Sequence, residues 1–196
     1  MKLLFVDCCI SQRGSGSRTR RLADAYLKAF RESHSDWEVE TVDLTAMELL
    51  PLTAAILNRR DALALEGRFD DPLFALACQF RDADRGLVAA PFWDISFPAV
   101  LRTYIEHICA NGVGYHYDEQ GPHGDCRADR LIYLTSGGDF ERENSLGVAY
   151  WQQLTAMLGI GSFDSVFAGG LDAVPDRAEE FLAHACRKAA ELGGAS

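Results

Sequence analysis

The sequence has no apolar segment long enough to cross a bilayer, since none approaches the ~20 residues that a membrane-spanning helix needs. The first residues, Met1 to Asp7, hold only a short apolar stretch that ends at an acid. A secretory signal peptide needs a longer apolar region followed by a small-residue cleavage site. We therefore expect a first strand here and a cytoplasmic protein.

Paired cysteine motifs are also missing. The six cysteines form no C-x-x-C pair, and the adjacent Cys8 and Cys9 have a spacing that common metal sites do not use. We expect reduced thiols and no metal site. Because Cys8 and Cys9 precede a candidate anion site, a lowered pKa of their thiols is one hypothesis.

Positive charge is scarce, with 19 Lys and Arg against 29 Asp and Glu and a formal net charge of −10. This balance argues against a nucleic-acid partner, which would need clustered basic residues. One local exception is a basic cluster of Arg13, Arg18, Arg20 and Arg21 beside a Ser/Gly-rich turn. The cluster is either a solvated helix face or part of an anion site.

Strand and helix patterns alternate along the 196 residues, which is typical of a single α/β domain with a parallel sheet covered on both faces. Strands are expected at 3–9, 37–43 (an edge strand), 86–91, 130–135 and 162–168. Helices are expected at 17–33, 53–66, 72–84, 98–110, 145–158 and 175–192. The segment 112–129 has no helical period, and a loop of that length is usually functional.

In an open parallel sheet, ligands bind beyond the carboxyl ends of the strands. The first such loop runs from Cys9 to Thr19 and leads into a helix, where unpaired N–H groups and the helix dipole favour a phosphate. Neither GxxxxGK[ST] nor GxGxxG occurs here, so nucleoside triphosphates and Rossmann-type dinucleotides are disfavoured. An ordinary turn with Ser17 as the helix N-cap remains an equal alternative.

Two further loops follow buried strands. The first contains Phe92 and Trp93, whose rings are either the edge of the core or a wall for a planar ligand. The other, Thr135 to Phe140, contains Gly137-Gly138, which is either a tight turn or a point where backbone and ligand approach closely. Three such loops at the same end of one sheet favour a binding site.

On three segments the sequence resembles the flavodoxin-like NAD(P)H-dependent oxidoreductases, in particular the FMN-dependent NADH azoreductase/quinone reductase family. These segments are Ser17-Arg18-Thr19, the stretch from Pro91 to Gly124, and Thr135 to Gly138. The resemblance implies a flavodoxin-like three-layer sandwich with a five-stranded parallel sheet in the order 2-1-3-4-5. It also implies a homodimer with two FMN sites, each completed by both subunits.

The resemblance carries roles for individual residues. Ser17, Arg18 and Thr19 would hold the FMN phosphate near Cys9; Pro91, Phe92, Trp93, Asp94 and Ile95 would border the isoalloxazine ring; Thr135, Ser136, Gly137 and Gly138 would lie at its opposite rim. Tyr115, Tyr117 and Phe140 would shape the substrate pocket. No catalytic residue is assigned, although His116, His123 and Tyr117 are candidates for protonating an acceptor.

Two positions depart from the family pattern. Cys9 stands where a serine is common, which removes a hydroxyl donor to phosphate. Asp94 stands in place of the usual asparagine, and a carboxylate there would lower the reduction potential of the flavin by Coulomb repulsion.

The expected activity is transfer of hydride from NAD(P)H through bound FMN to a quinone, azo or nitro acceptor. Two alternatives remain. One is an acidic, flavodoxin-type electron carrier that serves a protein partner, which the net charge favours. The other is a flavodoxin-fold protein that has lost flavin binding.

Overall fold

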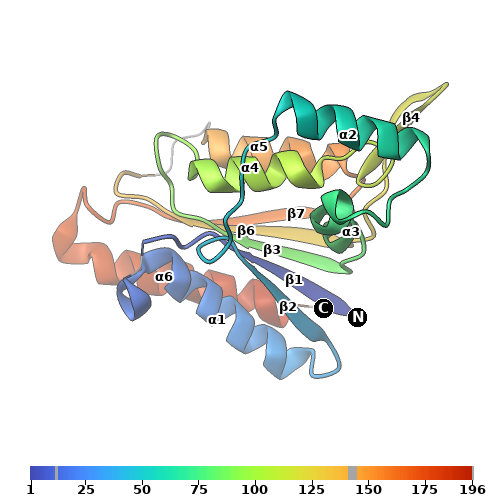
Figure 1. Cartoon of the computed structure of the whole chain (residues 1–196). Coiled ribbons are helices and arrows are strands. Elements are labelled where there is room, and N and C mark those ends of the chain that lie inside the picture. The colour runs from blue at the N-terminus through green and yellow to red at the C-terminus, as the bar shows by residue number, and fades with distance from the viewer. Residues whose placement is uncertain (12, 141–144, 196) are drawn as a thin grey trace.

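The computed structural model describes residues 1–11, 13–140 and 145–195. Its main sheet has five parallel strands in the order β2-β1-β3-β6-β7 (Figure 1). The strands are β1 (Lys2–Asp7), β2 (Glu38–Asp43), β3 (Arg85–Ala89), β6 (Arg130–Ser136) and β7 (Phe163–Ala168). Counted along the chain, the strands of this sheet lie in the order 2-1-3-4-5, which confirms the expected flavodoxin-like topology.

Helices cover both faces of the sheet (Figure 1). Within the described ranges they are α1 (Arg18–Ser33), α2 (Ala54–Leu65), α3 (Ala75–Arg81), α4 (Ala99–Ile108), α5 (Leu146–Met157) and α6 (Ala178–Gly194). Short 3-10 turns at Gly14–Gly16, Pro72–Phe74 and Pro175–Arg177 precede α1, α3 and α6. The last two account for the amino-terminal ends of the helices expected at 72–84 and 175–192. None of the helices in these ranges is long and apolar enough to cross a membrane.

Two apolar cores separate the three layers. The core on one face packs α1 and α6 against the sheet around Leu22, Tyr26 and Phe30. On the other face α4 and α5 pack around Tyr104 and Trp151. The central strand β3 is buried along its whole length, as a strand covered on both faces must be, whereas only one residue of the edge strand β2 is buried.

The segment 112–129, expected as a loop, contains a β-hairpin. Strands β4 (Tyr115–Asp118) and β5 (Gly121–Gly124) pair antiparallel across a short turn. Gly124 lies directly against the end of α5, where a Cβ atom would be 2.0 Å from Gly159 N and from the Leu158 carbonyl carbon. The hairpin therefore docks at the amino-terminal end of the main sheet, opposite the ends where β1, β3 and β6 finish (Figure 1).

Candidate ligand-binding cleft

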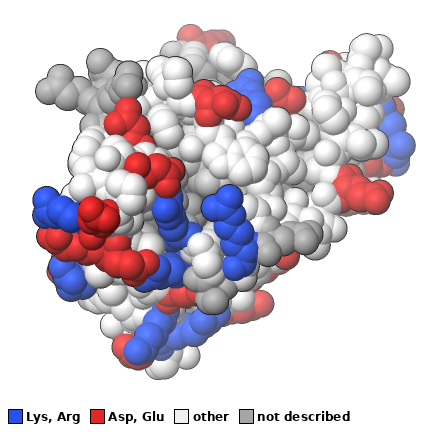
Figure 2. Space-filling model, turned by 90° about the vertical axis from the view of Figure 1, so that its left-hand side faces the viewer, with Lys and Arg blue, Asp and Glu red and all other residues white. Residues whose placement is uncertain are grey.

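A cleft of about 260 Å³ opens at the carboxyl ends of the strands. Its walls come from the three loops that the sequence singled out and from the loop after β7. The lining residues are Ser11, Arg13, Ser17, Arg18, Thr19, Pro91, Phe92, Trp93, Ser136, Gly137, Gly138 and Asp172. Figure 2 views this end of the molecule and shows Lys and Arg side chains gathered beside the hollow, in a protein that is acidic overall.

The first wall is the amino-terminal end of α1. Ser17 is the N-cap, and its Oγ accepts the backbone N–H of Arg20 at 3.4 Å. The first N–H groups of a helix have no partner within it, so those of Arg18 and Thr19 are available to a ligand. The Ser17 O–H remains free to donate as well. The N-cap interpretation is confirmed. It is compatible with an anion site, because the cap uses the Ser17 oxygen as acceptor while such a site would use the Ser17 O–H and the free backbone N–H groups as donors.

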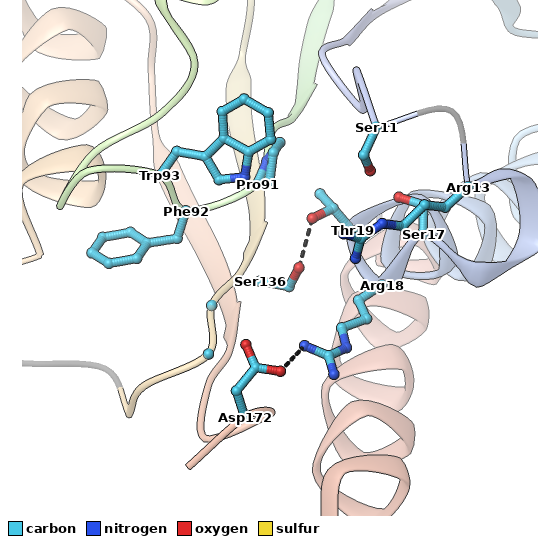
Figure 3. A pocket seen from close by; sticks show the side chains of 12 residues that line it. Ser11, Arg13, Ser17, Arg18, Thr19, Pro91, Phe92, Trp93, Ser136 and Asp172 are labelled. Atoms are coloured by element: carbon cyan, nitrogen blue, oxygen red, sulfur yellow. Dashed lines mark hydrogen bonds and ion pairs between the residues drawn. The ribbon is translucent and has the colours of Figure 1, made fainter. Parts of the chain in front are cut away.

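A buried hydrogen bond joins this wall to the glycine-containing loop. Thr19 Oγ1 lies 2.6 Å from Ser136 Oγ, and both side chains are buried (Figure 3). The hydroxyl of Thr19, expected to hold a phosphate, is thus engaged with another loop. Its backbone N–H, which has no partner within the helix, is the group of Thr19 that remains available to a ligand.

The Arg18 side chain extends away from the helix terminus at which its backbone N–H lies. Its Nη1 lies 2.8 Å from Asp172 Oδ1, and its Nη2 donates to the Leu171 carbonyl oxygen at 3.3 Å (Figure 3). Asp172, which the sequence analysis did not identify, follows β7 and so stands at the same edge of the sheet as the other loops. Its position directly after a strand of the parallel sheet is the one feature of the sequence that could have indicated Asp172.

The remaining arginines of the basic cluster lie apart from the cleft walls, except for Arg13. Arg20 forms an ion pair with the buried Asp7, and Arg21 pairs with Glu179 of α6 at 2.7 and 2.8 Å. The solvated-face interpretation therefore fits Arg21. The anion-site interpretation fits Arg13 and the start of α1.

Cys9 is buried beside the cleft. Its N–H donates to Asp7 Oδ1 at 3.0 Å, and it lines a small adjoining cavity of about 200 Å³ with Ser11, Gly14, Ser17, Arg20 and Thr45. Burial, followed by the charge of Asp7, raises the pKa of the Cys8 thiol to about 12, and it raises the pKa of Cys9 as well. The hypothesis of lowered thiol pKa values is therefore wrong, because desolvation and the Asp7 charge raise both pKa values and Arg20 opposes them only at Cys9.

The second wall is aromatic. Phe92 is anchored through its N–H to the Ser136 carbonyl at 2.9 Å, and its ring packs edge-on against Phe167 at 5.4 Å. Trp93 remains 44% exposed, with its indole standing at the cleft opposite the start of α1 (Figure 3). Of the two aromatic residues, Phe92 is thus partly an edge of the core, and Trp93 is the open wall.

A strained turn carries Trp93. Trp93 and Ser96 exchange backbone hydrogen bonds at 2.8 and 3.3 Å, and the two residues between them, Asp94 and Ile95, have φ values of 50° and 68°. A β-branched residue rarely adopts this left-handed conformation. Such strain persists where the surrounding structure requires it, as at ligand sites.

Replacing Ile95 with glycine is expected to leave the thermal stability unchanged or to raise the midpoint by up to about 4 °C. Relief of about 1–2 kcal/mol of left-handed strain outweighs the entropy that glycine adds to the unfolded chain. Ile95 is 64% exposed, so little packing is lost. Differential scanning calorimetry measures the midpoint of unfolding of both variants. The control is Ile56→Gly, because Ile56 lies in the regular backbone of α2. Equal destabilisation by both substitutions would contradict this account.

The third wall is the glycine-containing loop after β6. A Cβ atom on Gly137 would come within 2.9 Å of the Phe167 ring, and one on Gly138 within 2.4 Å of Asp172 Oδ2. Gly137 has no room for a side chain beside the Phe167 and Phe92 rings, whereas at Gly138 the close atoms belong to the exposed Asp172 side chain, which can rotate away. A flat ligand can then approach the peptide groups directly.

Several expected site residues lie outside the cleft walls. Thr135 is fully buried, Asp94 and Ile95 are exposed in the turn that follows Trp93, and Phe140 packs against Phe181. Gln12, within the first loop, is outside the described residues.

The residues of the hairpin lie farther away. Tyr115 and Tyr117 are on β4, at the opposite end of the sheet, and so cannot reach the cleft of their own chain. On the same hairpin, His116 and His123 stack with ring centroids 5.4 Å apart. Each contacts a carboxylate: His116 Nδ1 lies 2.8 Å from Asp125, and His123 Nε2 lies 2.9 Å from Asp118.

The chemical groups on the walls indicate which kind of ligand the cleft can bind. One end offers helix N–H groups, hydroxyls and Arg13, which suit a phosphate. The other end offers an indole face and glycine peptide groups, which suit a flat, partly polar ring system. A planar ring joined to a phosphate by a short polar chain, such as FMN, fits both ends.

Comparison with known proteins agrees with this geometry. A model of the family described by its flavodoxin-like fold matches residues 1–192. FMN-dependent NADH:quinone oxidoreductase 2 of Clostridium acetobutylicum is 31% identical over 195 residues, which cover 97% of this chain and 96% of that protein. The FMN-dependent NADH:quinone oxidoreductase of Trichlorobacter lovleyi is 29% identical over 203 residues and covers 96% of each.

Solved structures agree on the fold. The azoreductase from Bacillus anthracis str. Sterne superposes with a TM-score of 0.87 at 24% identity over 99% of both chains. An FMN-dependent NADH-azoreductase from Bacillus anthracis str. Ames Ancestor, solved in complex with FMN, has a TM-score of 0.82 at 16% identity over 98% of this chain and 96% of that one.

Proposed function

The chain belongs to the family with the flavodoxin-like fold, and on that premise we propose that it is an FMN-dependent NAD(P)H oxidoreductase that reduces quinone or azo acceptors. The observation that carries the proposal is the cleft itself, in which a helix terminus suited to phosphate faces an indole and two glycines suited to a flavin ring. The relatives of Clostridium and Trichlorobacter carry the same activity in their names. A nitro acceptor and the use of NADPH beside NADH are finer parts of the same proposal.

The chain supplies binding and orientation. The N–H groups of Arg18 and Thr19, the Ser17 hydroxyl and Arg13 would hold the phosphate, so these donors would offset the lack of a hydroxyl at position 9. Trp93 would face the ring, and Gly137 and Gly138 would let backbone groups approach its polar edge. Bound FMN supplies the transfer of hydride, so the protein needs no acid–base residue of its own at the cleft.

The spectrum of the purified protein tests the proposal. We expect flavin absorbance that bleaches when NADH is added without air and returns when a quinone is added. A flavodoxin-type carrier would show the flavin spectrum but almost no NADH oxidation. If the protein shows no flavin absorbance after incubation with FMN, it has no flavin site, and the proposal is refuted.

Asp94 allows a test of the electrostatics at the rim. Asp94→Asn removes a negative charge next to Trp93 and should raise the two-electron potential of bound FMN by about 20 mV, which corresponds to about 1 kcal/mol. Spectroelectrochemical titration measures the shift. Asp36→Asn, at the opposite end of the sheet between α1 and β2, is the control and should leave the potential unchanged. A lowered potential in Asp94→Asn would contradict the Coulomb argument.

A homodimer is part of the proposal. An apolar groove of about 760 Å³ runs along α5 next to the Trp93–Ser96 turn. It is lined by Ser96, Leu146, Ala149, Tyr150, Gln153, Leu154 and Met157. A second copy covering this groove would bury exposed leucine and methionine side chains and would place part of the interface beside the cleft. The β4–β5 hairpin cannot reach the cleft of its own chain, but in such a dimer it could approach the cleft of the partner subunit. Tyr115 and Tyr117 would then lie at the acceptor site.

The protein is proposed to act in the cytoplasm. All six cysteines are free thiols in the structure, with no disulfide between them, as expected in a reducing compartment.

A further inference from the structure

The guanidinium of Arg18 lies at the wrong end of the cleft for a phosphate ligand. Although Arg18 opens α1 beside Ser17, its side chain runs along the cleft to the loop after β7 (Figure 3). There it contacts Asp172 at 2.8 Å and the Leu171 carbonyl at 3.3 Å. The charged group therefore stands with the glycine-containing loop, where the ring of the ligand would lie, and not with the hydroxyls of the first loop.

Asp172 is fixed at this end by the backbone. Its N–H and that of Ala173 both donate to the Gly138 carbonyl, at 2.9 and 3.0 Å. Its carboxylate lies so close to Gly138 that a Cβ atom there would be 2.4 Å from Oδ2 and 3.1 Å from Cγ. The backbone of Asp172 is thus tied to Gly138, and its carboxylate lies beside the peptide groups that would meet the ring edge, where it pairs with Arg18.

The pair leaves part of Arg18 free for a ligand. A guanidinium has five N–H donors, and the contacts described engage one on each of its two terminal nitrogens. The Arg18 and Asp172 side chains are 36% and 69% exposed, so the ion pair itself stabilises the fold little. Its placement on the cleft wall, with donors to spare, is better explained by a role toward the ligand.

We propose that Arg18 acts on the ring end of the bound flavin, with Asp172 as the residue that positions it, and that the two opposite charges together set the reduction potential. This inference rests on the proposed binding of FMN. Reduced flavin carries a negative charge on its N1–C2=O edge at neutral pH, whereas oxidised flavin is neutral in the ring. A nearby cation therefore favours the reduced form and a nearby carboxylate opposes it.

The two partners must then act in opposite directions. Arg18→Gln leaves Asp172 uncompensated, so the affinity for reduced relative to oxidised FMN should fall roughly threefold to tenfold, a potential lower by about 15–30 mV. Asp172→Asn leaves Arg18 uncompensated and should raise the same ratio by a similar factor. The double variant should return close to the original potential. A merely structural role would move both single variants in the same direction.

Comparing FMN with riboflavin separates the ring from the phosphate. Riboflavin has the same ring and no phosphate, so the ratio of the two affinities, measured by quenching of flavin fluorescence, should be unchanged in Arg18→Gln. The backbone N–H of residue 18 persists in this variant, which preserves the proposed phosphate contact. The matched control is the pair Arg21–Glu179, one turn along α1, off the cleft and bidentate at 2.7 and 2.8 Å. Neither Arg21→Gln nor Glu179→Gln should move the potential.

Two results would overturn the inference. One is a shift of the same sign, or no shift, in Arg18→Gln and Asp172→Asn. The other is a loss of FMN affinity in Arg18→Gln that riboflavin does not share, which would make the guanidinium a phosphate ligand. Failure of the unsubstituted protein to bind either flavin is a separate result, which refutes the proposed function and the inference with it.

Discussion

Replacing Gly124 with alanine is expected to lower the midpoint of thermal unfolding by roughly 6–12 °C, which corresponds to about 3 kcal/mol for a chain of this length. The reason is a backbone-to-backbone contact. The new methyl group would lie 2.0 Å from Gly159 N and from the Leu158 carbonyl carbon, and 2.4 Å from the Leu158 oxygen. No side-chain rotation can relieve such a contact, so the hairpin must separate from the end of α5.

Gly121→Ala is the matched control for that experiment. Gly121 lies in the same hairpin, has a φ of 118°, and would place its Cβ in open space. Its substitution therefore costs only the backbone strain of this nearly glycine-specific conformation, about 1–3 kcal/mol. Calorimetry of both variants measures the difference. Equal losses of stability would show that the hairpin does not depend on its contact with α5. Because the hairpin carries Tyr115 and Tyr117, we also expect a larger loss of quinone reductase activity in Gly124→Ala.

Leu146→Glu is expected to turn the proposed dimer into a monomer, weakening association at least a hundredfold. Leu146 lines the groove on α5 and is 58% exposed in the single chain. In a two-fold symmetric dimer the substitution occurs twice, and each buried leucine contributes about 1.5–3 kcal/mol. Burying a carboxylate in its place adds a further penalty.

The fold of the chain should survive this substitution. Leu146 opens α5, and an acidic residue in the first turn of a helix interacts favourably with the helix dipole. Light scattering after gel filtration measures the mass. Leu65→Glu is the control, because Leu65 is 91% exposed on α2 and lies outside the groove. Dissociation by Leu65→Glu instead would place the interface on α2, and an intact dimer in Leu146→Glu would rule out the groove. Activity should be lost together with the dimer, because both subunits are proposed to complete each site.

The sequence predicted the sheet and the location of the cleft because both depend on local patterns. Buried apolar runs end at loops with unusual composition, and parallel strands bring their carboxyl ends to one edge. The cap at Ser17 was likewise visible, since a hydroxyl before an amphipathic helix is a local signal. These features do not require knowledge of which residues meet across the fold.

The missed features depend on contacts between distant residues or on unfavourable local conformations. Asp172 acquires its place from Arg18 and Gly138, which are far from it in the sequence. Thr19 has an ordinary helical position, and only the fold shows that its hydroxyl meets Ser136. Ile95 was not expected in a left-handed turn because β-branched residues avoid that conformation. The hairpin lacks an apolar alternation and contains a proline, so no strand pattern indicated it.

The Thr19–Ser136 hydrogen bond also bears on how the cleft meets its ligand. Two of its walls are tied together through buried side chains, so the distance between them is set by the protein alone. A cofactor entering such a cleft does not have to pull the walls into position, and its binding energy is not spent on ordering them. The protein should therefore release its flavin without unfolding and take up modified flavins of the same shape. That property would make this chain a practical scaffold for artificial redox cofactors.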